Sequence, residues 1–469
     1  MSSCYETTGS LGQAMFGHAE LGDRRRAARL VTTFDRMRRH PGGTLPDKLS
    51  SPADLKALYR LCASQSVAHE AIVAAMRKFT LKRIATHRGS VLVVHDATEL
   101  DYTTLESLAG ELGQIGKGTR RGYICHNVIA LDARTGEVLG LLDQILHCRD
   151  DVPQGETLNQ HRNRETRESL LWVKGTGHLP DDRRLVDVAD QGASTFEFLE
   201  HETNSGRRFV VRNGKVRKVR GGHEPDGPQE YLKEYVQSLP ELGRFTMDVP
   251  AQKGRKARTQ AEFAIRGGPI LLLPPHAKHG HHGNDPLPLY VVYVAEVSRP
   301  PRGEDPIHWV LLTNEPIVDL DDAWRVVEWY ERRWVVEEYH KAMKTGCRIE
   351  DLQFTAVERL EPAIALLSAV ALTLLNLRDA SRRPDASTRQ ADTLFAPEYV
   401  EVLSVWRYGK LRNDLTIHDF FFALARLGGH QNRKSDHRPG WLVLWRGWMK
   451  LQLMFDGYLV VKRKTCGET

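Results

Sequence analysis

Two strongly apolar stretches, each followed by an acidic residue, constrain the fold of this chain more than any other feature. Residues 91–94 read Val-Leu-Val-Val and lead to Asp96, and residues 185–189 read Leu-Val-Asp-Val-Ala and lead to Asp190. Such strands are typical of sheets that helices cover on both faces, because both sides of the strand are then buried. The sequence therefore predicts an α/β fold with acids near strand ends, where they could bind a ligand or only face solvent.

Further strands follow from the local pattern. Residues 123–132 and 137–145 predict an antiparallel hairpin, because a short Ala-Arg-Thr-Gly turn joins two apolar runs. Other strand-like segments, separated by Gly, Pro and basic loops, are residues 208–212, 269–273, 287–297 and 308–313.

A helix predicted over residues 321–344 separates an apolar face from a polar one. At about 100° per residue, Tyr330, Arg333, Glu337 and Lys344 share one narrow arc, and the opposite face is apolar. Taken alone, Arg333 and Glu337 are equally consistent with an ion pair on a solvated face, which contributes only about 0.2–0.5 kcal/mol.

The spacing of these four residues resembles a known signature. Tyr330 is followed after two residues by Arg333, after three more by Glu337 and after six more by Lys344. This is similar to the YREK signature of bacterial insertion-sequence DDE transposases of the IS-four family. The resemblance implies that Glu337 is a catalytic carboxylate and that Tyr330, Arg333 and Lys344 contact DNA.

The same resemblance gives a role to the two acids near strand ends. The run Asp96–Tyr102 is similar to the family's block around its first catalytic carboxylate, and Asp190 stands in the place of the second. The chain departs from the family pattern directly afterwards, where it has Gln191, Gly192 and Ser194. The surroundings of Asp190 are therefore less certain than its role as a ligand.

Three carboxylates are suitable ligands for hard divalent cations. By the resemblance, Asp96, Asp190 and Glu337 bind two Mg²⁺ ions, and Mn²⁺ is expected to substitute because oxygen ligands suit both metals. Two such ions can activate water or a 3′-hydroxyl and stabilise the leaving oxygen at phosphorus. The expected enzyme is a metal-dependent DNA nuclease and polynucleotidyl transferase.

Other residues are expected to contact DNA. Arg121 and His126 match family positions, although a lone histidine in a strand is usually part of the core. Trp309 lies twenty-one residues before the first residue of the signature, as the family's base-stacking tryptophan does, and Arg212 lies in a stretch, residues 205–220, with seven Lys or Arg and no acid. Basic stretches suit a DNA backbone, although solvated loops have the same composition. A second basic group consists of Lys253, Arg255, Lys256 and Arg258.

Residues 11–88 are predicted to be helical, with one apolar and one basic face. Between Asp23 and Arg39 there are seven arginines and two acids. Guanidinium groups bind phosphate bidentately, although a solvated helix face could have the same pattern. The resemblance implies a domain that recognises transposon ends, in which the candidate contacts are Arg24, Arg25, Arg26 and Arg29.

The resemblance implies an α/β fold with an RNase H-like catalytic core of the retroviral-integrase type. The expected domains are a helical DNA-binding domain at residues 1–88, the catalytic domain at residues 89–380 and a helical dimerisation domain at residues 381–469. Because 147 residues separate Asp190 from Glu337, a β-rich insertion is expected at about residues 205–315.

The resemblance predicts cut-and-paste transposition of an insertion sequence. A homodimer in the synaptic complex would cleave double-stranded DNA at the terminal inverted repeats, through a hairpin intermediate, and join the 3′ ends to target DNA. The alternative is a DNA-binding repressor that has kept the fold and lost catalysis. The presence of all three carboxylates and of the other signature residues argues against that alternative.

The resemblance implies a bacterial cytoplasmic protein that is associated with the nucleoid when it is bound to DNA, and the composition is compatible with a cytosolic location. The net charge is +6, and the six cysteines are scattered, which predicts reduced thiols. The most apolar run, residues 364–377, is interrupted by Ser368, Thr373 and Asn376 and is too short to cross a membrane. No membrane partner is therefore expected.

Overall fold

The protein is described by a computed structural model that covers residues 10–49, 51–151, 153–249, 251, 255–275, 281–433 and 438–465. Lys253 of the second basic group lies outside these residues. The chain begins with helices α1 (Leu11–Phe16), α2 (Arg24–Arg39), α3 (Leu45–Lys48), α4 (Pro52–Cys62) and α5 (His69–Thr86). The helical prediction for this part of the chain is confirmed.

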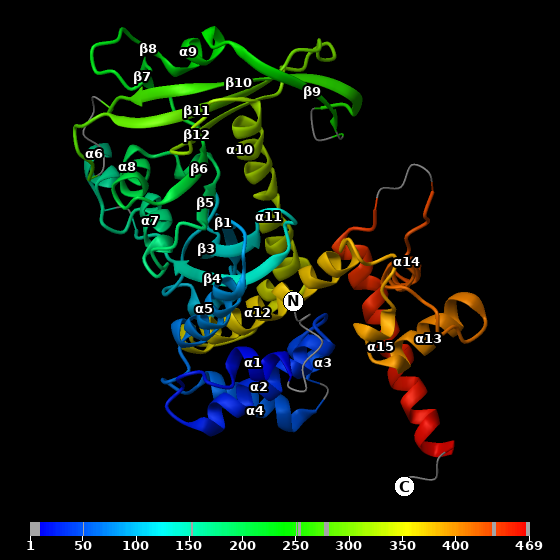
Figure 1. Ribbon diagram of the computed structural model, residues 1–469. Coiled ribbons are helices and arrows are strands. Elements are labelled where there is room, and N and C mark those ends of the chain that lie inside the picture. Colours follow the sequence, from blue (N-terminus) through cyan, green and yellow to red (C-terminus); the bar gives the residue numbers. More distant parts are fainter. Residues whose placement is uncertain are drawn as a thin grey trace.

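A mixed sheet lies at the centre of the molecule (Figure 1). Its central strands are β1 (Val91–Asp101), β3 (Arg121–Asp132), β4 (Val138–His147), β5 (Leu185–Ala189) and β6 (Arg208–Arg212). Strand β3 pairs antiparallel with both β1 and β4, and β5 pairs parallel with both β1 and β6. The apolar side chains of residues 91–94 are fully buried, as predicted. This mixed α/β arrangement is consistent with an RNase H-like core.

Strand β1 continues beyond Asp96, contrary to the expectation that the strand ends there. Its parallel pairing with β5 stops at the pair His95 and Ala189, but its antiparallel pairing with β3 continues to Asp101. Asp96 therefore follows the end of the parallel contact, not the end of the strand. Asp190 does follow the last residue of β5 directly.

The insertion extends the central sheet and does not form a sheet of its own. Strand β12 (His308–Thr313) pairs with β6, and all strands belong to one sheet of twelve strands in the described part of the chain. We expected β6 within the insertion, but its parallel pairing with β5 makes it a core strand. Helix α8 (Phe196–Asn204) supplies the crossover that parallel pairing requires.

The remaining elements of this region complete the sheet and its borders. They are β2 (Gly113–Gln114), α6 (Leu158–Arg162), α7 (Leu171–Thr176), β7 (Lys218–Gly221), β8 (Gln229–Tyr231), α9 (Leu232–Ser238), β9 (Glu241–Val249), β10 (Arg258–Leu272) and β11 (Leu287–Glu296).

The helix predicted over residues 321–344 is irregular in the structure. It consists of α10 (Leu320–Arg332), α11 (Trp334–Lys341) and a π-helical turn, Ala342–Gly346. The Arg333 N–H bonds the Tyr330 carbonyl at 3.0 Å, and the Cys347 N–H bonds the Ala342 carbonyl at 2.8 Å. These bonds span three and five residues, so the regular hydrogen-bond ladder is interrupted at two places.

Helix α12 (Val357–Ser381) lies between the sheet and the N-terminal helices (Figure 1). It is long and apolar enough to span a membrane by composition, but 89% of its most apolar window is buried inside the protein. It contacts α2, α4, α5 and β4. A buried core helix explains its composition.

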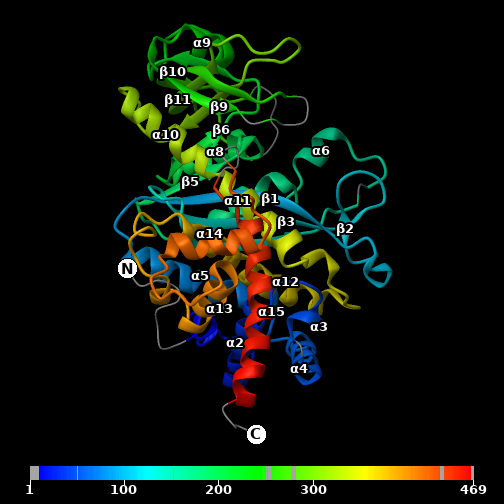
Figure 2. The same ribbon diagram turned by 90° about the vertical axis from the view of Figure 1, so that its right-hand side faces the viewer.

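The C-terminal region has its own apolar cluster, formed by α13 (Pro397–Tyr408), α14 (Ile417–Leu427) and α15 (Trp441–Thr465). Figure 2 shows α15 passing α14 and running on to the C-terminus. Gly447 of α15 allows a close crossing, because a Cβ atom there would lie 1.9 Å from the Leu424 carbonyl oxygen. Gly428 has the same role, since its Cβ would lie 2.0 Å from the Val443 carbonyl oxygen.

We expect Gly447→Ala to destabilise the C-terminal region by about 1–3 kcal/mol, because the added methyl group pushes α14 and α15 apart. Gly457→Ala in the same helix is the matched control, since no atom lies within 4 Å of its Cβ position. The control should leave stability unchanged or raise it by up to about 1 kcal/mol. Urea unfolding followed by circular dichroism measures both, and equal effects would contradict the close crossing.

Candidate active site

Asp96 and Asp190 lie at one edge of the parallel part of the sheet, because β1 and β5 run in the same direction. The pKa of Asp96 is raised to about 7, mainly by burial and also by the negative charges of Asp190 and Glu337, against the opposing effect of Arg333. The three carboxylates that were predicted to act together are thus within electrostatic range of one another.

Local backbone structure fixes the position of Asp190. Its Oδ1 accepts a hydrogen bond from the Gly192 N–H at 2.8 Å and caps the short helix Gln191–Ala193. A Cβ atom on Gly192 would lie 2.8 Å from the Trp172 ring, so a small residue is needed here. Ser194 is buried, and its hydroxyl oxygen accepts the Gly214 N–H at 3.1 Å. Two of the residues that depart from the family pattern therefore have structural roles.

Arg333 joins two of the three carboxylates. Its Nη1 donates to Asp96 Oδ2 at 3.1 Å, and its Nη2 donates to Glu337 Oε1 at 2.8 Å. Only 12% of the Arg333 side chain is exposed. The predicted pair between residues 333 and 337 therefore exists, but it does not lie on a solvated helix face.

The donor set fits a hard divalent cation, because it consists of carboxylates whose mutual repulsion a cation would relieve. Within the residues that the structure describes, however, no group of three His, Cys, Asp or Glu side chains is placed to hold a metal ion. The guanidinium group of Arg333 lies between Asp96 and Glu337 instead. A metal ion would have to take over contacts that Arg333 now makes.

Tyr330 and Trp309 are neighbours on the insertion side of the site. Their ring centroids are 5.6 Å apart at an interplanar angle of 66°, and the Arg333 guanidinium lies 5.6 Å from the Tyr330 ring. Tyr330 is buried, whereas Trp309 is half-buried and packs at the edge of the main apolar cluster. Trp309 is therefore a partly packed strand residue whose ring also reaches the signature helix.

The other predicted DNA contacts near the site differ in their accessibility. Lys344 is paired with Glu350, with 3.3 Å between Nζ and Oε1. Arg121 and Arg212 are half-buried residues at the start of β3 and the end of β6. Arg212 pairs with Leu311, two residues from Trp309 along β12. These three cations lie on three different elements.

His126 does not fit its predicted role in binding DNA. Its side chain is fully buried, and its ring lies 5.3 Å from the ring of Trp172 and 5.8 Å from that of His95. Burial lowers the pKa of His126 well below its usual value, and the proximity of His95 and His340 lowers it further. Neither ring nitrogen has a hydrogen-bond partner among the described residues. It is a neutral core histidine in this structure.

The predicted basic surfaces are partly neutralised by acids of the protein itself. On α2, Arg24 and Arg25 are exposed, whereas Arg26 donates to the Leu21 carbonyl at 2.9 Å and Arg29 pairs with Asp54 at 3.4 Å. In and near the insertion, Arg207, Arg208 and Arg258 also form ion pairs, with Asp187, Glu315 and Glu296. The number of basic residues therefore overstates the cationic surface that is free for DNA.

A buried charge network, which was not predicted from the sequence, lies beneath the site. Asp187 is fully buried in β5, where its Oδ1 lies 2.8 Å from His95 Nε2 and its Oδ2 accepts Arg207 Nη2 at 2.6 Å. The pKa of Asp187 is lowered, because the His95 and Arg207 contacts outweigh its burial. An acid inside an apolar strand was the available signal that a buried partner existed.

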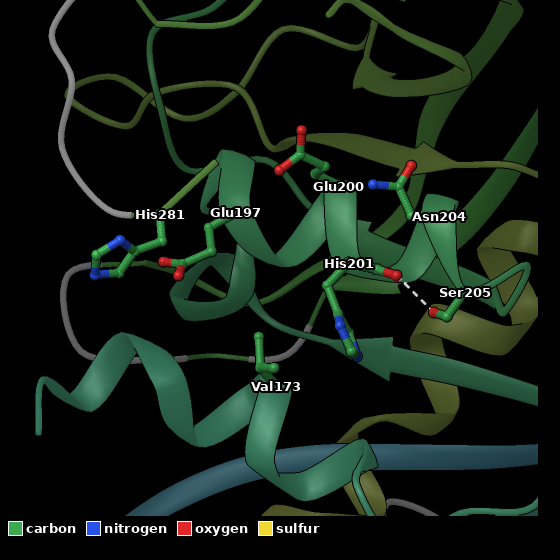
Figure 3. Close-up of a pocket in the computed structure, with 7 residues that line it drawn as sticks. All are labelled: Val173, Glu197, Glu200, His201, Asn204, Ser205 and His281. Carbon is green, nitrogen blue, oxygen red and sulfur yellow. Dashed lines mark hydrogen bonds between the residues drawn. The ribbon is translucent and has the colours of Figure 1, made fainter. Parts of the chain in front are cut away.

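A separate cavity of about 450 Å³ lies beside α8 (Figure 3). None of the three carboxylates lines it. Its acids already have partners, since Glu197 binds Arg167 at 2.5 Å and Glu200 accepts the Gly283 N–H at 2.9 Å. This cavity is therefore separate from the predicted carboxylate site.

Two comparisons with protein families agree with this geometry. Residues 11–67 match the family described as transposase DNA-binding. Residues 87–374 match the family described as transposase DDE domain, and this match covers more than half of the chain. The second match contains Asp96, Asp190 and Glu337, and the first contains the arginines of α2.

We expect Asp96→Asn to stabilise the metal-free protein at pH 8. The folded-state pKa of about 7 exceeds the ordinary value of 3.8. Ionised Asp96 therefore disfavours folding, an effect that is absent below about pH 4 and complete above about pH 7. A gain of about 1–3 kcal/mol is expected, less than the about 4 kcal/mol that three pKa units represent. Chemical denaturation in EDTA at pH 4 and pH 8 measures it.

Asp101→Asn on the same strand is the control with the opposite sign. Burial raises the pKa of Asp101, but hydrogen bonds from Thr103 and Arg120 outweigh this and lower it. The control should therefore lose stability at pH 8. A loss of stability in both variants at pH 8 would contradict the repulsion among the three site carboxylates.

Proposed function

The chain belongs to the transposase DDE domain family and is an enzyme that acts on DNA; from this premise we propose that it performs cut-and-paste transposition. The finer proposal is membership of the IS-four group with the YREK signature, which includes the transposase of the kanamycin, bleomycin and streptomycin resistance transposon. The substrates are the terminal inverted repeats of the element and a target duplex. Cleavage proceeds through a DNA hairpin, and the 3′ ends are then joined to the target.

One observation carries this proposal: Arg333 contacts Asp96 and Glu337, while Asp190 and Glu337 both raise the pKa of Asp96. Charged side chains that are far apart in sequence thus interact with one another at one place in the fold. A carboxylate with a raised pKa, such as Asp96, is typical of catalytic sites, where repulsion is retained for function.

We propose that Asp96, Asp190 and Glu337 hold two divalent ions, Mg²⁺ in the cell and Mn²⁺ as a substitute. Such ions supply activation of water or a 3′-hydroxyl and stabilise the leaving oxygen. The chain's own cations position the DNA: Arg333 and Lys344 bind phosphates beside the site, with Tyr330, Arg121 and Arg212 around them.

End recognition belongs, in this proposal, to the α2 arginines, Arg24, Arg25, Arg26 and Arg29. The exposure of Arg24 and Arg25 supports this assignment. We assign end binding to residues 1–88, chemistry to residues 89–380 and dimerisation to residues 381–469. The insertion, expected at about residues 205–315, begins in this proposal after the core strand β6. His126 is left out of the contact set because it is buried.

A homodimer is proposed for the synaptic complex, in a protein that is cytoplasmic and nucleoid-associated when bound to DNA. Apolar side chains on α15 support dimerisation, because Leu453 is 68% exposed and Val460 is 55% exposed. Exposed apolar residues on one long helix are suited to a partner helix of a second copy.

Replacing the proposed helical ligand tests the catalytic assignment. We expect Glu337→Ala to abolish Mg²⁺-dependent cleavage of inverted-repeat DNA, by more than about 100-fold, because a metal ligand is lost. End binding should persist. Glu328→Ala on α10 is the control, because this acid is exposed and should leave both activities intact. A cleaving Glu337→Ala protein would refute the assignment, and a wild type that binds ends without cleaving them would favour the repressor alternative.

Trp309 is proposed to stack on a base that is flipped out during hairpin formation. Its contact with Tyr330 and its partial exposure support this role. Stacking contributes about 1–3 kcal/mol, so Trp309→Ala should slow hairpin formation roughly 10- to 100-fold and spare the first nick. Gel analysis of single-turnover products separates the two steps.

Trp309→Phe provides the control for packing, because a phenyl ring fills part of the space and still stacks. It should restore most of the hairpin rate. Equal slowing of nicking and hairpin formation in Trp309→Ala, together with a lower melting temperature, would assign the indole to the core instead.

A further inference from the structure

Lys344, which the proposed function assigns to DNA phosphate, is held by an acid of the protein itself. Its Nζ lies 3.3 Å from Glu350 Oε1, and the two side chains are 31% and 28% exposed. Lys344 belongs to the π-helical turn Ala342–Gly346, and Glu350 belongs to the short helix Ile349–Asp351. Because both groups reach solvent, a phosphate could replace the carboxylate.

A hydrogen bond from the last residue of β1 holds the Glu350 carboxylate in place. The same Oε1 accepts a hydrogen bond from the Asp101 N–H at 3.0 Å. The hydroxyl of the fully buried Tyr102 donates to the Ile349 carbonyl at 3.0 Å and holds the adjoining backbone. The carboxylate is therefore a fixed negative charge, while the lysine is the flexible partner.

The surroundings add further negative charge. Asp101 pairs with Arg120 at 2.9 Å, and Glu99 Oε1 accepts the Gly116 N–H at 2.6 Å. The hydrogen bond to Asp101 raises the pKa of Arg120, and the negative charge of Glu350 also raises it. Glu350 therefore acts on two cations, and a phosphate that approaches Lys344 meets an acidic strand end.

We propose that Glu350 is a built-in competitor that withholds Lys344 from DNA until a phosphate displaces it. This inference rests on the proposed function, in which Lys344 binds phosphate. Exposed ion pairs are weak, so the competition should reduce DNA affinity about two- to fivefold at low salt. Glu350 is thus a positioning residue, because it affects DNA through Lys344.

The test is DNA binding by Glu350→Gln, which removes the charge and keeps an oxygen that can accept the Asp101 N–H. The probe is a fluorescent duplex of mixed sequence in EDTA, with affinity measured by anisotropy at about 50 mM and about 200 mM salt. We expect binding about two- to fivefold tighter than wild type at the lower salt and a smaller gain at the higher salt, because salt screens the pair.

Three further proteins serve as controls for this test. Glu358→Gln changes the net charge equally at an exposed position of α12 and should show a smaller gain. In a Lys344→Ala background, Glu350→Gln should show no gain, because the lysine for which it competes is absent. Glu350→Asp, with a shorter side chain, should act in the same direction as Gln, and it replaces Gln if that variant is misfolded by circular dichroism.

Two outcomes would overturn this inference alone. They are a Glu350→Gln affinity no higher than that of Glu358→Gln, or an undiminished gain in the Lys344→Ala background. A wild-type protein that does not bind the duplex would overturn the proposed DNA contact of Lys344, and this inference with it. The two failures are therefore distinguishable.

Discussion

The contacts of Arg333 with Asp96 and Glu337 organise the catalytic half of the molecule. They connect a central strand to a helix across 237 residues of sequence. Asp96, with 16% of its side chain exposed, is well shielded, so loss of the arginine would leave a poorly solvated charge. The regular helix is interrupted at Arg333 itself, because α10 ends at Arg332 and α11 begins at Trp334. The Arg333 side chain thus connects the sheet to the helix through its contacts with the two carboxylates.

The ionised carboxylates of the site lower the stability of the folded protein. Burial and the negative charges of Asp190 and Glu337 together make it costly to ionise Asp96. The surrounding structure holds the carboxylates in position. Asp190 directly follows β5, and the buried contact between Asp187 and His95 connects β5 to β1 below the site. Stability lost at functional sites is usually offset elsewhere, and the fully buried core of α12 is one such source.

The elements that could be predicted from the sequence are those whose structure follows from burial alone. Apolar runs predicted β1 and β5 and the buried helix α12, and the acids near the strands were identified from their neighbours. Tertiary contacts explain the differences: β6 joined the core because β5 supplied a parallel partner, and β1 continued because β3 did. Periodicity could not predict the irregular turns around Arg333 and Lys344, nor could it distinguish the buried His126 from an exposed DNA contact.

Net charge is a poor guide to how this transposase would engage DNA. Many of its cations already have acidic partners in the free protein: Arg333 has Asp96 and Glu337, Lys344 has Glu350, and Arg29 has Asp54. In the proposed complex, phosphates would replace these carboxylates at the cations, while metal ions would take the carboxylates that Arg333 releases. Binding of DNA and binding of metal would then support each other, because each removes a competitor of the other. The catalytic site would then form completely only when DNA and metal ions are both bound.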